Sequence, residues 1–170
     1  MDASTWQRHA SPWSVYTRMA TLPLLALAIW SHAWYGAWLA IGATFAVCAW
    51  LWVNPRLFPP PKTMESWASK ATLGERIWLN RSAVPIPGED SRTAMTLSLV
   101  TGVGFIATVY GSISNELLIA VPGLIVTYAG KLVFLDRMVR LYEQMRNAHP
   151  LYRFWSVAPD NDNTRKAQSA

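Results

Sequence analysis

The residues best suited to bind a ligand gather in one polar stretch, residues 54–87. Three arginines there, Arg56, Arg76 and Arg81, present the planar, always charged fork that grips phosphate and carboxylate groups. Glu75 is placed to hold one of these guanidinium groups in position. The stretch predicts a site for an anionic lipid headgroup, a phosphometabolite or a partner protein, formed by Asn54, Arg56, Trp67, Glu75, Arg76, Trp78, Asn80 and Arg81.

The elements that must position this stretch are four apolar segments, at about 17–34, 35–53, 94–111 and 117–135. The short connections 31–36 and 112–116 contain no Lys or Arg, and all 15 basic residues lie on the other side of the pattern. A membrane protein shows this asymmetry when its positive segments stay in the cytoplasm. The predicted site residues therefore have a second interpretation: they orient the protein and fasten the connector to the helices.

The fold class that we predict is all-α: a bundle of four transmembrane helices, made of two helical hairpins. A cytoplasmic interfacial amphipathic helix is expected between them. The expected segments are an N-terminal cytoplasmic segment at 1–16, a first hairpin at 17–53, a connector at 54–92, a second hairpin at 93–135, a cytoplasmic helix and aromatic segment at 136–158, and a disordered tail at 159–170.

The connector is expected to leave the membrane in an extended form at 54–61, because its prolines cannot continue a helix. Thr63 is placed to cap a new amphipathic helix over 64–81. Its apolar side chains recur at helical spacing and include Trp67 and Trp78, which would anchor it. Such a helix either lies in the membrane interface or packs over the cytoplasmic end of the helix bundle.

Several local patterns predict contacts within the helices. Asp136 with Arg140 and Glu143 with Arg146 have the spacing of helical neighbours. The small residues Gly36, Ala40, Thr44 and Cys48 recur every four positions, which indicates a packing seam with the first helix or with a partner subunit. Pro122-Gly123 predicts a kink or local unwinding of the last apolar helix. His32 and Glu116, one in each external turn, would meet only if the hairpins pack side by side.

Composition narrows the class of protein. Apolar residues make up 52% of the chain and charged residues 15%, too few charges for a soluble domain of 170 residues. The net charge of +5 accompanies the apolar segments, so attraction to an anionic membrane surface explains it better than nucleic-acid binding. No spacing typical of a metal site, a phosphate loop or a catalytic serine occurs, and we predict no cofactor, no metal and no catalytic residue.

The connector has the pattern Asn-Pro-Arg-x-Phe-Pro-Pro-Pro, a Trp, then Leu-Gly-Glu-Arg-x-Trp-Leu-Asn-Arg and Pro-Ile-Pro. It resembles an uncharacterised family of small bacterial and archaeal integral membrane proteins, a domain of unknown function. The resemblance covers residues 54–87 closely and the flanking helices loosely. It implies membership of a class of protein and brings no activity with it.

We therefore expect a small multi-pass protein of a prokaryotic inner membrane, with both termini cytoplasmic. The first hypothesis is a non-enzymatic subunit that binds a membrane-protein partner, or a second copy, and assists assembly. The second is an enzyme that acts on an anionic lipid or isoprenoid phosphate at the cytoplasmic face. The third is a small oligomeric transporter. The expected partners are the lipid bilayer, another membrane protein and an anionic lipid.

Overall fold

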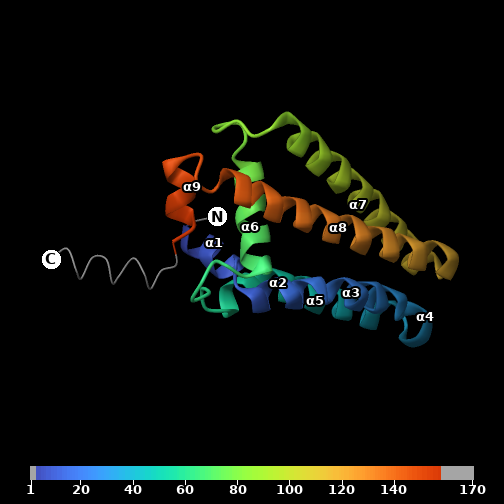
Figure 1. Ribbon diagram of the computed structural model, residues 1–170. Helices are drawn as coiled ribbons and strands as arrows, with labels where there is room; N and C mark the ends of the chain where they lie inside the picture. Colours follow the sequence, from blue (N-terminus) through green and yellow to red (C-terminus); the bar gives the residue numbers. More distant parts are fainter. Residues whose placement is uncertain (1–2, 158–170) are drawn as a thin grey trace. The chain divides into compact units, whose positions relative to one another are not determined.

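The computed structural model describes residues 3–157, and over this range the chain is helical and contains no β-strand (Figure 1). The all-α prediction is confirmed for these residues. The predicted disordered tail at 159–170 lies outside the described residues. Of the described helices, three are long and apolar enough to cross a membrane: α5 (Ala37–Leu57), α7 (Gly88–Ser114) and α8 (Leu117–Met145).

The chain divides into two compact units. One, called here the apolar unit, comprises Tyr16–Asn54 and Met95–Phe134. The other, called the charged unit, comprises Met1–Val15, Pro55–Ala94 and Leu135–Ala170, and it holds every basic residue of the chain except Arg18 and Lys131. The charged unit is thus built from three separated pieces of sequence.

The first apolar segment is divided into three short helices: α2 (Pro12–Met19), α3 (Thr21–Trp30) and α4 (His32–Tyr35). The expected single helix over 17–34 is therefore interrupted. Both junctions nevertheless keep right-handed α backbone angles, and the amides of Ala20 and Ser31 still donate to the carbonyls four residues earlier, at 3.0 and 2.9 Å. The interruptions change the direction of the chain little at each junction because the helical hydrogen bonds continue through them.

The second segment forms α5, which begins after Gly36 and passes through Pro55 to Leu57. The prediction that the chain becomes extended at 54 is wrong. Pro55 lies in the last turn of the helix, which ends two residues later at Leu57. Asn54 is fully buried, and its Nδ2 donates to Thr17 Oγ1 at 2.7 Å, which holds the end of α5 against α2. Gly36 has a φ of +85°, which suits a residue without a Cβ and makes the tight turn into α5.

Helix α7 begins at Gly88, six residues before the expected start, with Glu89 and Asp90 in its first turn. Acidic side chains there stabilise the positive end of the helix dipole. Helix α8 runs without interruption through Pro122-Gly123, so the predicted unwinding does not occur. The two helices lie side by side (Figure 1).

The seam between α7 and α8 is formed by small residues. A side-chain carbon added at Gly104 would lie 2.8 Å from Thr127 Oγ1, and one at Gly123 would lie 2.7 Å from the amide nitrogen of Thr108. One at Gly111 would overlap the backbone of Ala120. Close backbone approach of this kind drives helix association in membranes. The ladder predicted on α5 is different, because only Ala40 is buried there while Gly36 and Cys48 are exposed.

Helix α6 (Trp67–Leu79) is the centre of the charged unit, together with α1 (Ala3–His9) and α9 (Pro150–Trp155). It is shorter than the expected 64–81. The apolar positions Ala68, Ala71 and Ile77 are buried as predicted, but Ser69 and Thr72 of the expected polar face are buried too. Helix α6 is therefore enclosed on more than one side, which a helix lying flat in a membrane interface would not be.

Gly74 of α6 lies very close to Met138 of α8. A side-chain carbon at Gly74 would overlap the carbonyl group of Met138, so only glycine permits this contact. Met138 is fully buried. The glycine of the Leu-Gly-Glu-Arg stretch is thus explained by packing of two helix backbones.

The α7–α8 seam predicts different outcomes for two nearby glycines. Gly104→Val should lower the stability of the folded protein by about 1–3 kcal/mol, because the added methyl groups meet Thr127 and Gly123. Gly102→Val is the matched control, since nothing lies within 4 Å of a side-chain carbon there. Thermal unfolding in detergent micelles measures both. Equal losses in the two variants would contradict the seam.

Candidate functional site

The start of α6 is set by a chain of hydroxyl groups. Ser66 is the N-cap: its Oγ accepts a hydrogen bond from the amide of Ser69 at 3.1 Å, which satisfies one of the open donors of the first turn. The two hydroxyls lie 2.7 Å apart, and Ser69 Oγ donates to the carbonyl of Ala10 at 2.8 Å. The predicted cap at Thr63 is therefore wrong, and Ser66 and Ser69 fasten the N-terminal segment to α6.

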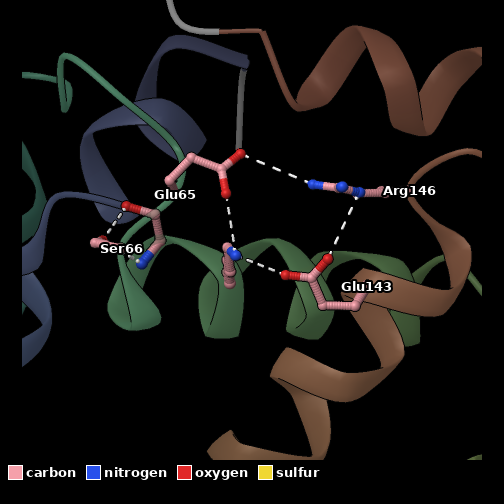
Figure 2. A network of polar contacts seen from close by, with 6 residues as sticks. Glu65, Ser66, Glu143 and Arg146 are labelled. Carbon is pink, nitrogen blue, oxygen red and sulfur yellow. Dashed lines mark hydrogen bonds and ion pairs between the residues drawn. The ribbon is translucent and has the colours of Figure 1, made fainter.

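A closed ring of two acidic and two basic side chains joins the residues before α6 to the end of α8 (Figure 2). Lys70 Nζ lies 3.0 Å from Glu65 Oε2 and 2.6 Å from Glu143 Oε1. Arg146 closes the ring, with Nη1 3.8 Å from Glu65 and Nε 3.6 Å from Glu143. Each acid contacts both bases, so the ring is electrically balanced and holds α6 to α8.

Lys70 is the least exposed member of the ring, at 19% of its side-chain surface against 67% for Glu65. The hydrogen bond to Glu143, and then the one to Glu65, raise the pKa of Lys70 above its usual value. The predicted helical neighbours are confirmed: Glu143 contacts Arg146, and Arg140 Nη2 lies 3.1 Å from Asp136.

Arg76 contacts aromatic rings from both terminal helices. Its guanidinium carbon lies 3.7 Å from the centre of the Trp155 ring of α9 and 5.5 Å from that of Trp6 of α1. Burial lowers the pKa of Arg76 below its usual value. Contacts between a cation and indole rings are worth about 0.5–2 kcal/mol, more where water is excluded. Arg76 is thus engaged within the protein, where it holds the two ends of the chain together.

Helix α9 is positioned for this contact. His149 caps it, with Nδ1 accepting from the amide of Leu151 at 3.2 Å. Tyr152 is buried and packs on Trp155 with ring centres 5.3 Å apart. The aromatic segment 151–155 therefore packs its Tyr and Trp within the charged unit.

At the end of α6 two of the predicted site residues, Trp78 and Arg81, contact each other. The Arg81 guanidinium lies over the Trp78 ring at 4.5 Å from its centre, and Nη1 donates to the Trp78 carbonyl at 2.9 Å. Asn80 is the C-cap residue of α6.

The other predicted site residues are dispersed. Asn54 belongs to the apolar unit, where it contacts Thr17. The carbonyl of Arg56 accepts a hydrogen bond from Arg8 at 3.2 Å. Trp67 is the first residue of α6, and Glu75 is half-buried within it.

Sequence reasoning missed Trp6, Lys70, Trp155 and the link from Glu65 to α8, because these contacts join residues far apart in the chain. The spacing of residues in a sequence predicts contacts along one helix only. For the pair His32 and Glu116 the structure shows a neighbouring contact: Nε2 of His32 lies 3.2 Å from Nδ2 of Asn115, the residue before Glu116.

Within residues 3–157, no group of three or more His, Cys, Asp or Glu side chains is arranged to hold a metal ion.

These observations define the class of the protein: an all-α protein with three described helices able to span a membrane, and with a charged unit held by an ionic ring and by an arginine packed on two indole rings. The chain belongs to a family of unknown function, DUF6653, whose family model matches residues 1–160. The chain matches neither a curated protein nor a solved structure.

The ionic ring predicts a dependence on alkaline pH. Because the pKa of Lys70 is raised on folding, its contribution to stability is present below the unfolded value of about 10.5 and is lost as pH rises through the folded value. Lys70→Met should therefore lower stability near neutral pH by about 1 kcal/mol. Its difference from the wild type should shrink at strongly alkaline pH.

Unfolding midpoints of the wild type and the variant, measured across pH in the same detergent, test this dependence. Lys62→Met removes an exposed lysine of the same unit outside the ring and is the matched control. A pH-independent difference between Lys70→Met and the wild type would show that the ionic contact does not cause the loss.

Proposed function

We propose that the protein is a non-enzymatic, multi-pass protein of the cell membrane that binds a partner protein through its charged unit. In this proposal four membrane helices form two hairpins, with both termini and the connector on the cytoplasmic side. The fourth crossing is supplied by the consecutive helices α2, α3 and α4, whose hydrogen bonds continue through both junctions.

Three features support the membrane arrangement. Only 11% of the most apolar part of α5 is buried within the protein, so its side chains face outward where lipid would cover them. Exposed aromatic residues lie at both ends of this helix, Trp38 at one and Trp52 at the other, as membrane interfaces favour. The basic residues gather in the charged unit, which agrees with a cytoplasmic location for that unit.

One observation carries the partner-binding role: charged side chains of the connector form contacts within the protein. Lys70 and Glu65 lie in the ionic ring, and Arg76 lies against two indole rings. A connector needed only for orientation does not require an organised body made from three parts of the chain. A fixed body with exposed apolar side chains, such as Phe154 of α9, is suited to binding another protein.

Topology is tested with reporter fusions. A reporter active only in the cytoplasm should work when inserted after Pro85, in the turn between α6 and α7. A reporter active only outside should work after Asn115, in the turn between α7 and α8. The opposite result at Pro85 would end the proposed arrangement.

Partner binding is tested by placing a photo-crosslinking amino acid at Phe154 in living cells, with Ala33 in the external turn as control position. We expect a product of one defined size at Phe154 and no such product at Ala33. A product of twice 19.0 kDa would identify a second copy of the chain as the partner. Protein that is extracted with its native lipids and runs alone, without a product at Phe154, would contradict the proposal.

A further inference from the structure

The end of α6 carries a buried hydrogen-bond donor that has no acceptor among the described residues. This is the Nδ2 atom of Asn80. A buried amide left without a partner costs about 1–3 kcal/mol, so native proteins retain such groups rarely. A cation, Arg81, is the next residue in the chain.

Arg81 is held in a defined orientation. The guanidinium lies over the Trp78 ring, and its hydrogen bond to the Trp78 carbonyl uses one of its five N–H donors. The ring contact fixes the plane of the fork, and a fork fixed in this way matches the oxygen atoms of a phosphate bidentately. The Arg81 guanidinium and the Nδ2 atom of Asn80 are both hydrogen-bond donors, which suits an acceptor with several oxygen atoms.

We propose that Asn80 and Arg81 form a binding site for a phosphate group. Nδ2 of Asn80 donates one hydrogen bond to a phosphate oxygen, and the guanidinium of Arg81 contributes charge and further donors. The positive charge is essential, since the C-terminal end of a helix carries partial negative charge that disfavours an anion. The site is independent of the partner-binding role proposed for the charged unit.

Two sources of phosphate have the required chemistry: the headgroup of an anionic phospholipid and a soluble phosphate. Leu79 lies between Trp78 and Asn80 in the sequence. It exposes 53% of its surface and would contact the apolar part of a lipid. The experiment therefore presents each source separately, to protein in maltoside detergent micelles, which contain no phosphate.

The full-length protein is titrated with phosphatidylglycerol in one series and with inorganic phosphate in another, and its thermal unfolding midpoint is followed. A ligand that binds the folded state raises this midpoint with concentration. A rise with phosphatidylglycerol alone assigns the site to a lipid headgroup, and a rise with inorganic phosphate as well assigns it to phosphate in general. No rise with either probe overturns the proposal.

Two variants locate the effect. Arg81→Gln should weaken binding at least about tenfold, because a hydrogen bond to a charged group is lost. Asn80→Asp keeps the shape of the side chain but places a negative charge against the phosphate, so it should abolish the midpoint rise. If Arg81→Gln fails to fold, Asn80→Asp alone decides.

Arg137→Gln removes the same charge from an exposed position on α8 and is the matched control. It should bind like the wild type. Equal weakening in Arg137→Gln and Arg81→Gln would show that the response reflects overall charge, and it would overturn the site.

Discussion

The contact between the backbones of Gly74 and Met138 is the constraint on which the charged unit depends. It brings α6 so close to α8 that Lys70, one turn before Gly74, reaches Glu143, while Arg76, two residues after it, reaches the aromatic rings of the terminal helices. Interactions between exposed charges are individually weak, and their strength here comes from the fixed distance between two helices. The ionic ring and the arginine contact are consequences of that packing.

Much of the fold was predictable, because the membrane segments and the helical neighbours follow from local patterns. The pairs Asp136–Arg140 and Glu143–Arg146 are set by the geometry of one helix, and both occur. Boundaries were predicted less well. Pro55 remains in the last turn of α5, and Ser66 caps α6 because Ser69 and Ala10 complete its hydrogen-bond chain. The hydrogen-bond chain of Ser66 includes the contact of Ser69 with Ala10, and these two residues lie 59 positions apart, which no local pattern contains.

The sequence indicates the region of the candidate site, but it does not predict the contacts that its side chains make. The chemical type of Arg76 predicts a ligand-binding residue. In the structure its guanidinium packs against side chains of the protein itself. Its partners Trp6 and Trp155 lie in segments that had been assigned no role together. Trp78 and Arg81 contact each other because they lie three positions apart at the end of one helix. Contacts set by tertiary structure were missed wherever the helices of the charged unit met.

The contact of Arg76 with Trp6 and Trp155 also affects the order in which the charged unit can form during synthesis. A ribosome makes Trp6 first and Trp155 almost 150 residues later, so during synthesis the arginine has only one of its two aromatic neighbours. At about 5–20 residues per second this interval lasts many seconds. Until α9 is made, α6 exposes surface that the finished protein covers. The nascent chain therefore passes through a stage at which chaperones and proteases of the cell have access to it, and that access ends when the last helix docks.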